Sequence, residues 1–400
     1  MNKVAFFYAT FPRPTETFVR RELRAFALIG FDPDLYSIWK GDSEWEGKKI
    51  FKFQFFRLLH LFFWIPYWAW KKPQVFKEIL IALWTKPCPN LQNWNETFLA
   101  LGFALVEARN FKNKKYSLLH GIWATMPSTA ALAVSKLTNT PFSMGAHAYD
   151  VFRTGGDWLL QYKFHNALFI RTSSQSTARR IRQLGVPTKK IKLIRRGLAS
   201  WPVRSNFELV NLARLELLSV GRLVEKKGYI YQLKIAADLF ARAVPFRLQI
   251  IGSGPLQKFL VEETNRLGIA DHVVFIGSKS QKETRKVFLE SDIFLFTGVV
   301  AKNGDRDGIP NVIPEAMSSG CLILASCNAG ASEAFIEDVS GFSLNPKETK
   351  NWSSLLEEFW EEPGSFQLMR KRAIEHSKQA FDVKSTAHSF CSVIEQNMNL

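Results

Sequence analysis

From residue 216 onward, short apolar runs alternate with amphipathic stretches of about ten to fifteen residues. The first of these helical stretches are Gly228–Phe240 and Pro255–Leu267. Near-continuous apolar strands separated by helices are typical of a parallel sheet that helices cover on both faces. We therefore expect residues 205–380 to form a doubly wound α/β domain. The predicted strands are Leu217–Val220, Leu248–Ile251, Val273–Ile276, Ile293–Phe296 and Leu322–Ala325.

The first half repeats this scheme less regularly, and residues 1–200 are predicted to form a second Rossmann-like domain. A final helix within residues 383–400 is expected to cross back to it. The predicted fold class is therefore α/β, with two Rossmann-like doubly wound parallel-sheet domains that face each other across a cleft. The predicted strands are Val4–Tyr8, Leu118–Leu119, Pro141–Met144, Ala167–Ile170 and Ile191–Ile194, and the predicted helices are Glu16–Ile29, Met126–Leu137 and Ser174–Leu184.

The charge of the chain is distributed unevenly. Residues 1–200 carry 30 Lys and Arg against 12 Asp and Glu, whereas residues 201–400 carry 23 against 24. The basic first half is expected to meet an anionic partner, either a nucleic acid, a membrane surface or an acidic lipid-linked substrate. The basic residues between 179 and 196 lack an aromatic stacking platform, so no nucleic-acid partner is predicted.

Residues 51–87 interrupt the α/β pattern with an aromatic and basic insertion. A membrane-spanning helix is a poor interpretation, because Lys52, Arg57, His60 and Pro66 break the apolar run. The insertion either lies in a membrane interface, with aromatic rings at headgroup depth, or forms a helical excursion that packs on the first domain. The basic character of the first half favours contact with an anionic membrane surface.

The four cysteines show no metal-ligand spacing. They are Cys88, Cys321, Cys327 and Cys391, and buried thiols are expected at Cys321 and Cys327. The opening apolar run is too short for a signal peptide. We therefore expect a protein of the reducing cytoplasm, held peripherally at the inner face of the plasma membrane.

The segment from Asp307 to Gly320 carries the strongest functional signal. Asn311 is predicted to cap a helix that tolerates Pro314 in its first turn and ends at Gly320. A helix that starts beyond a strand's carboxyl end directs free N–H groups at a bound anion. Asp307 and Glu315 supply carboxylates that can accept hydrogen bonds from sugar hydroxyls. A capped helix with two solvated acids is the alternative interpretation.

A basic turn after the strand Leu217–Val220 favours the functional interpretation. Arg222 offers two parallel donors to phosphate oxygens, and Lys227 offers a point charge. Gly254 lies in a further glycine turn, Gly252–Pro255, after the next strand. Together these residues suggest a clamp for a diphosphate.

These motifs resemble the family-4 glycosyltransferases of GT-B fold. Asp307 and Glu315 resemble the acidic pair of that family, and Arg222 and Lys227 its phosphate-binding cations. In the first half, Ser143–Asp150 resembles an Ala-His-Ala-x-Asp motif, which places His147 on the family's active-site histidine. Fainter matches are Phe11–Phe18, which resembles the opening of exopolysaccharide branches, His120 and Asn328–Glu333.

The resemblance implies a retaining hexosyltransferase. It would move a sugar from a UDP- or GDP-linked donor to a lipid-linked or polysaccharide acceptor in cell-surface glycan synthesis, with the first domain on the acceptor side. His147 and Asp307 would be catalytic. The implied donor-binding residues are Arg222, Lys227, Gly254, Ile309, Pro310, Asn311 and Glu315.

The resemblance further implies that no cofactor or metal is needed, since the cationic clamp would neutralise the diphosphate leaving group. Asp305 and Asp307 nevertheless form an Asp-x-Asp, a spacing that could hold a divalent cation. Asp307 also stands where the family more often has the longer Glu. The alternatives are a GT-B epimerase or phosphorylase, and a basic membrane- or nucleic-acid-binding module without transferase activity.

Overall fold

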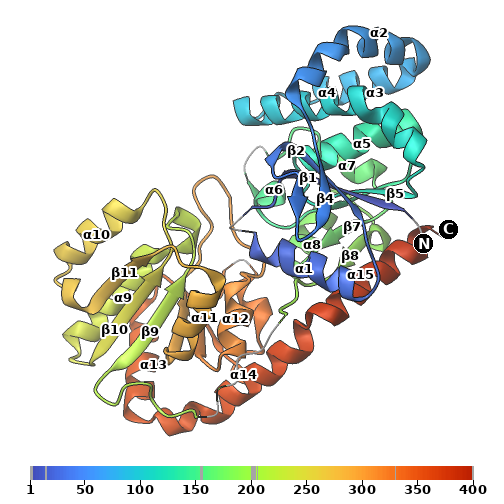
Figure 1. Ribbon diagram of the computed structural model, residues 1–400. Helices are drawn as coiled ribbons and strands as arrows, with labels where there is room; N and C mark the ends of the chain where they lie inside the picture. Colours follow the sequence, from blue (N-terminus) through green and yellow to red (C-terminus); the bar gives the residue numbers. More distant parts are fainter. Residues whose placement is uncertain are drawn as a thin grey trace. The chain divides into compact units, whose positions relative to one another are not determined.

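The chain divides into two compact units, which Figure 1 shows in a computed structural model. The structure describes residues 3–13, 16–153, 156–199, 204, 206–328 and 330–398. The first unit comprises Met1–Arg195 with Thr386–Leu400, and the second comprises Arg196–Ser385. Each unit is built on its own sheet, and both sheets are dominated by parallel strands. The prediction of two Rossmann-like α/β domains is therefore confirmed.

The sheet of the second unit consists of six parallel strands in the order β11-β10-β9-β12-β13-β14. Counted along the chain, this is the 3-2-1-4-5-6 order of the Rossmann fold, with the order reversing between β9 and β12. Ligands of such sheets bind outside the carboxyl ends of the strands at this reversal. The strands are β9 (Leu215–Val220), β10 (Phe246–Ile251), β11 (Val273–Gly277), β12 (Ile293–Phe296), β13 (Leu322–Ser326) and β14 (Phe342–Leu344).

Helices cover both faces of this sheet. Successive residues of each strand point to opposite faces, so they pack into two different cores. Ile293 and Leu295 pack with the buried side of α9 and α13, whereas Phe294 and Phe296 pack with α12. The five strands predicted here are confirmed, and β14 was not predicted. The helices are α9 (Tyr229–Ala241), α10 (Gln257–Arg266), α11 (Gln281–Leu289), α12 (Val312–Ser318), α13 (Thr349–Glu361) and α14 (Gln367–Ala380), with one-turn helices η3 (Glu225–Lys227), η4 (Ala270–His272), η5 (Ala331–Ala334) and η6 (Pro363–Phe366).

The sheet of the first unit has the order β3-β4-β2-β1-β5-β6-β7-β8. Only the short pair of β3 with β4 is antiparallel among the described strands. The order again reverses beside the first strand, between β1 and β5. The strands are β1 (Val4–Phe11), β2 (Asp34–Gly41), β3 (Glu44–Trp45), β4 (Lys48–Lys52), β5 (Leu118–Gly121), β6 (Phe142–Gly145), β7 (Ile170–Thr172) and β8 (Ile191–Leu193).

Some predictions for the first unit were wrong. The strand expected at Ala167–Ile170 is β7, Ile170–Thr172, because α7 continues to Asn166 and the next residues are a buried connection. Polar residues within β2 and β4 hid these strands from the apolar pattern. The thiol of Cys321 is buried as expected, but Cys327 lies past the end of β13 and is exposed.

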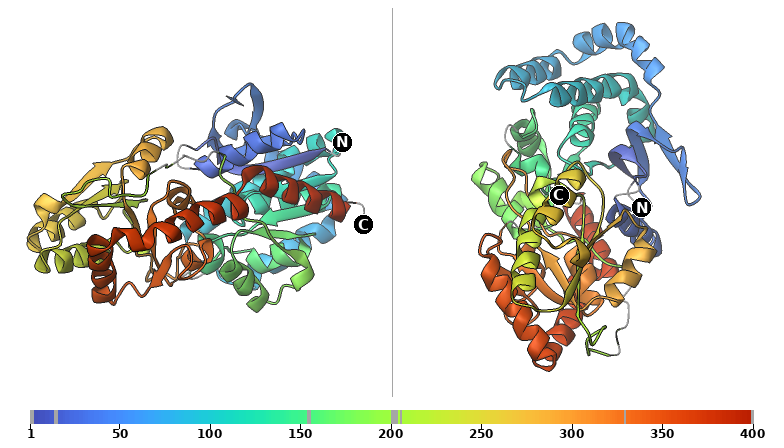
Figure 2. Two further views of the ribbon diagram at one scale, coloured as in Figure 1. Left: turned by 90° about the horizontal axis from the view of Figure 1, so that it is seen from below. Right: turned by 90° about the vertical axis from the view of Figure 1, so that its left-hand side faces the viewer.

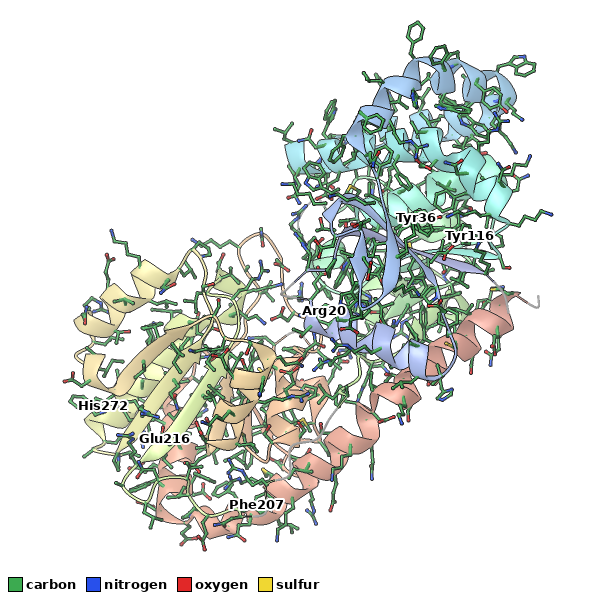
Figure 3. The ribbon with its side chains drawn as sticks, viewed as in Figure 1. Arg20, Tyr36, Tyr116, Phe207, Glu216 and His272 are labelled. Carbon is green, nitrogen blue, oxygen red and sulfur yellow. The ribbon has the colours of Figure 1, made fainter. Side chains whose placement is uncertain are left out.

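Aromatic side chains build much of the first unit's interior. Phe390 of α15 packs within 6.1 Å of Phe6 and within 5.2 Å of His120, measured between ring centroids. Tyr36 of β2 and Tyr116 lie beside one another, with hydroxyl oxygens 2.8 Å apart (Figure 3). The helices are α1 (Thr17–Leu28), α2 (Leu61–Lys71), α3 (Pro73–Trp84), α4 (Leu91–Lys114), α5 (Met126–Thr138), α6 (Tyr149–Phe152), α7 (Leu160–Asn166), α8 (Gln175–Gln183) and α15 (Val383–Met398), with short η1 (Phe55–His60) and η2 (Thr188–Lys190).

The insertion folds into η1, α2 and α3, which lie outside α4 (Figure 2). The indole Nε1 of Trp68 donates to the carbonyl of Leu105 at 2.9 Å. Gly102 of α4 leaves room for the insertion, since a Cβ there would lie 3.0 Å from Leu58. One side of the insertion therefore packs on the first unit. Among the described residues, no helix is long and apolar enough to cross a membrane.

Replacement of Gly228 tests how closely the turns after β9 and β12 approach each other. A Cβ at Gly228 would lie 1.9 Å from the carbonyl oxygen of Thr297, and the residue has φ +67°. We expect Gly228→Ala to lower the free energy of unfolding by at least about 2 kcal/mol, measured by urea denaturation.

Gly268→Ala is the matched control, because Gly268 has φ +70° but no atom within 4 Å of the added Cβ. We expect Gly268→Ala to lower the free energy of unfolding by about 1 kcal/mol, the cost of a positive φ for alanine without a steric clash. Equal losses in the two variants would contradict the close approach.

Candidate functional site

Three loops meet at the carboxyl edge of the second sheet. They follow β9, β10 and β12, and backbone hydrogen bonds join them. The amide of Leu223 donates to the carbonyl of Ser253 at 3.0 Å, and the amide of Val299 donates to the carbonyl of Lys226 at 2.9 Å. This edge includes the point where the strand order reverses, the usual ligand position in such a sheet.

Two glycines allow the loops after β9 and β10 to touch. A Cβ at Gly252 would lie 1.9 Å from the carbonyl oxygen of Gly221, and one at Gly254 would lie 2.5 Å from that of Leu223. Gly254 therefore has a packing role that needs no ligand. Its predicted contact with a donor stays a prediction.

Two lysines and two aspartates form an ion-pair cluster where the strand order reverses. The ammonium of Lys227 lies 2.7 Å from a carboxylate oxygen of Asp307. The ammonium of Lys226 lies 3.2 Å from the other oxygen of Asp307 and 3.1 Å from Asp305. The lysines belong to η3, just after β9, and the aspartates to the loop after β12. The predicted residues Lys227 and Asp307 are thus in direct contact.

The cluster keeps Asp307 ionised. Burial alone raises the pKa of this carboxyl, but the charges of Lys227 and Lys226 outweigh it and hold the pKa below its usual range. At neutral pH, Asp307 is therefore a carboxylate that can accept hydrogen bonds from hydroxyl groups.

Lys226 bears on the alternative that Asp305 and Asp307 hold a metal ion. Its ammonium lies between the two carboxylates, where a divalent cation shared by an Asp-x-Asp would have to sit. Its side chain is only 9% exposed. Over the described ranges, no group of three or more His, Cys, Asp and Glu side chains is arranged to hold a metal. The two aspartates of the Asp-x-Asp therefore already have a cation between them, the ammonium of Lys226.

Arg222 differs from the two lysines in being exposed, and it forms no ion pair with any described carboxylate. Its position directly after β9 leaves the guanidinium available to an anion from solution. Lys227 also packs over the ring of Phe296, 5.0 Å from its centroid. Arg222 is therefore a solvent-facing cation, whereas Lys226 and Lys227 are paired internally.

The helix after the acidic loop, α12, begins at Val312 with Asn311 before it. The expected cap is wrong in detail: Asn311 has helical backbone angles, and its side chain makes no capping hydrogen bond. Gly320 follows the helix with φ +78°, as its predicted role as a helix end requires. Glu315 lies in the first turn, and the partly buried Ile309 and the buried Pro310 lead into the helix. The donor-binding roles of these residues stay predictions.

His147 belongs to the first unit and lies in the loop after β6, 5% exposed. The carboxylate of Asp150 accepts hydrogen bonds from the amides of His147 at 3.1 Å, Ala148 at 2.8 Å and Ala124 at 3.1 Å. Thr177 donates to the carbonyl of His147 at 2.6 Å. The backbone of the predicted catalytic histidine is therefore fixed on both sides.

The ring of His147 meets that of Trp123 edge to face, with centroids 5.2 Å apart. The fully buried Lys163 donates to the carbonyl of Ala124, the residue after Trp123, forms an ion pair with Asp157 and donates to Thr129 at 3.0 Å. Burial lowers the pKa of Lys163, and the charge of Asp157 opposes that shift. Lys163 thereby ties the loop that carries Trp123 to α5 and α7.

Of the other motif residues, some have structural roles and some lie outside the described residues. His120 is 1% exposed, and its Nδ1 lies 2.8 Å from the hydroxyl of Ser143, so it is a core residue. Pro14 and Thr15 of the opening motif and Ala329 of the last one lie outside the described residues. Sequence reasoning overlooked Lys226, although its position next to Lys227 was the available signal. Lys163 gave no signal, being a lone cation within a short helix.

Comparison with known proteins identifies the second unit. Residues 205–380 match the sequence model of the family described as Glycosyl transferases group 1. This part of the chain is a group 1 glycosyltransferase domain. The chain is 24% identical over 415 residues to the putative colanic acid biosynthesis glycosyltransferase WcaL of Salmonella typhimurium, covering 98% of this chain and 99% of WcaL. It is 34% identical over 161 residues to the amylovoran biosynthesis glycosyltransferase AmsK of Erwinia amylovora, covering 40% of this chain and 39% of AmsK.

Solved structures show the same fold over nearly the whole chain. Anabaena Alr3699/HepE in complex with UDP and glucose has a TM-score of 0.70 at 16% identity, covering 99% of this chain and 100% of HepE. Sucrose-phosphate synthase from Thermosynechococcus elongatus has a TM-score of 0.73 at 14% identity, covering 99% of each chain. The two Rossmann-like domains of this chain are thus those of a GT-B fold.

Replacement of Asp150 tests how the loop of His147 is held. In Asp150→Asn, one carboxylate oxygen becomes an amide nitrogen that cannot accept from a backbone amide. We expect this variant to lose about 1–3 kcal/mol in the free energy of unfolding, measured by urea denaturation.

The exposed Asp271 of η4 provides the control. We expect Asp271→Asn to change the free energy of unfolding by less than about 0.5 kcal/mol. An Asp150→Asn protein as stable as this control would show that the three amide contacts do not hold the loop.

Proposed function

We propose that this chain is a retaining hexosyltransferase that takes its sugar from a nucleoside diphosphate. The observation that carries the proposal is the gathering of Arg222, Lys227 and Asp307 where the strand order of the group 1 domain reverses. Cations there oppose the charge of a diphosphate, and the carboxylate of Asp307 beside them, whose pKa the lysines lower, can orient sugar hydroxyls.

The proposed reaction breaks the bond between the sugar's anomeric carbon and a diphosphate oxygen. The bonding electrons leave with the diphosphate, and Arg222 and Lys227 stabilise the charge that it gains. An acceptor hydroxyl forms the new bond to the anomeric carbon, and its proton passes to the departing diphosphate oxygen. Retention of the anomeric configuration is proposed from the family resemblance. Glu315 is proposed to contact the nucleotide ribose, and His147 is the proposed catalytic residue of the first unit.

Named relatives support the choice of donor and acceptor. HepE was solved in complexes with UDP, with UDP and glucose, and with UDP-glucose. WcaL and AmsK are named for the biosynthesis of colanic acid and amylovoran. We therefore propose a UDP- or GDP-linked hexose as donor and a lipid-linked or polysaccharide acceptor in exopolysaccharide synthesis. The proposed location is the cytoplasm, at the inner face of the plasma membrane.

Transfer is tested by incubating the purified protein with UDP- and GDP-hexoses and membrane extract, and measuring nucleoside diphosphate release. We expect release that depends on the extract. His147→Ala should lower kcat by about 100-fold or more, while the nucleotide still raises the midpoint of thermal unfolding.

Analysis of the sugar products distinguishes transfer from epimerisation, since an epimerase needs no acceptor. Absence of release with every donor, or a new sugar nucleotide formed without extract, would contradict the proposal.

We also propose that transfer needs no metal, because Lys226 already supplies the charge between Asp305 and Asp307. EDTA should leave the rate unchanged. Lys226→Met removes this charge at similar length, and the two aspartates should then bind Mn²⁺, measured by isothermal titration calorimetry. We expect its kcat/KM to fall by about tenfold or more without metal.

Lys282→Met serves as the control, since Lys282 is exposed in α11 and far in sequence from the acidic loop. It should neither gain Mn²⁺ binding nor lose activity. Loss of wild-type activity in EDTA would show that transfer needs a metal and would contradict the proposal.

A further inference from the structure

The outward sides of η1, α2 and α3 expose large apolar side chains that no described residue covers. We call this surface the aromatic face. Phe62 and Trp70 of α2 are each 82% exposed, and Trp84 of α3 is 92% exposed. The face is completed by Phe56, Leu59 and Phe63, which are 63%, 78% and 70% exposed.

Helix geometry separates this face from the side that packs on the first unit. In α2, Trp68 is buried and Leu61 and Trp64 pack against the core, whereas Phe62 and Trp70 point away from it. The inward residues are enough to attach the insertion. The stability of the unit therefore does not explain why the outward residues are aromatic.

In the second unit, exposed apolar residues are scattered. Leu212 of the segment before β9, Phe240 of α9 and Phe259 of α10 are 83%, 50% and 49% exposed and lie far apart in sequence. Scattered residues of this kind are normal on a protein surface, whereas a contiguous apolar surface marks an interaction site. The aromatic face is denser, because six large exposed apolar side chains come from the three consecutive helices η1, α2 and α3.

The aromatic face is bordered by positive charge. Residues 51–90 contain six Lys and Arg and one acid, Glu78. The carboxylate of Glu78 is turned to the first unit, 2.9 Å from the ammonium of Lys136. Lys71, Lys77 and Lys86 are exposed, with Lys77 on the same side of α3 as Trp84. The border therefore attracts anions.

We infer that the aromatic face docks on an anionic lipid bilayer, with its rings at the boundary of headgroups and acyl chains and its lysines at lipid phosphates. The lengths of 11 and 12 residues for α2 and α3 are too short to span a bilayer, which takes about 20 residues. Surfaces that bind proteins are depleted in Lys, whereas this border is made of Lys. The inference rests on the proposed location at the plasma membrane, and it names the residues that would contact the bilayer. Its test needs neither a sugar donor nor an acceptor.

The test is co-sedimentation of the full chain with vesicles of phosphatidylglycerol and phosphatidylcholine, without nucleotide. We expect binding that strengthens with the phosphatidylglycerol fraction and weakens with salt. The combined variant Phe62→Ser, Trp70→Ser and Trp84→Ser should bind about 100-fold more weakly. Lys71→Gln, Lys77→Gln and Lys86→Gln together should lose a similar factor and most of the salt dependence.

Matched controls come from the second unit: Leu212→Ser, Phe240→Ser and Phe259→Ser for the apolar residues, and Lys282→Gln, Lys347→Gln and Lys350→Gln for the charges. Both should bind vesicles as the unchanged chain does. The test variants should keep the stabilisation by nucleoside diphosphate, so failure here is distinguishable from failure of the proposed transfer.

Three results would overturn the inference. The first is unchanged vesicle binding in the aromatic variant, and the second is equal binding to vesicles without phosphatidylglycerol. The third is a wild-type dimer in light scattering that the aromatic variant converts to a monomer while neither binds vesicles. That result would assign the face to a second copy of the chain.

Discussion

The ammonium of Lys226 lies between the carboxylates of Asp305 and Asp307. The ammonium of Lys227 pairs with the other carboxylate oxygen of Asp307. The charges of the two lysines hold the pKa of Asp307 below its usual range, against the effect of burial. The cluster joins the end of β9 to the loop after β12, where the Rossmann sheet reverses its strand order. Donor recognition, as proposed, depends on this balance, because the carboxylate that would orient sugar hydroxyls is held by the cation that would face the diphosphate.

The backbone around the cluster is built to permit this approach. Gly228 lies against the carbonyl of Thr297, and Gly252 against that of Gly221, so side chains at either position would force the loops apart. The first unit fixes the loop of His147 by different means. Asp150 collects three backbone amides around His147, and the buried Lys163 anchors the loop of Trp123. Each loop is therefore positioned by polar contacts at the ends of rigid strands.

The sequence predicts the strands of the second unit well, since runs such as Ile293–Phe296 are buried on both faces and need no polar residues. It predicts that Lys227 and Asp307 belong to one diphosphate-sugar site, but not that the two side chains form an ion pair. It does not reveal which of the neighbouring lysines, Lys226 or Lys227, pairs with which aspartate. In the tight turn of η3, Lys226 and Lys227 both reach Asp307, and only Lys226 also reaches Asp305. The cap expected from Asn311 failed because its backbone already continues the helical turn.

The central claim is that the edge of the second sheet binds a diphosphate through its cations. It is tested most directly by isothermal titration calorimetry of uridine, UMP and UDP, and of guanosine, GMP and GDP, with wild type, Arg222→Gln and Lys282→Gln. We predict that one series gains affinity of about tenfold or more with the second phosphate, and that Arg222→Gln loses this gain while Lys282→Gln keeps it. Equal affinity for nucleoside monophosphate and diphosphate in both series, or an unchanged gain in Arg222→Gln, would contradict the claim.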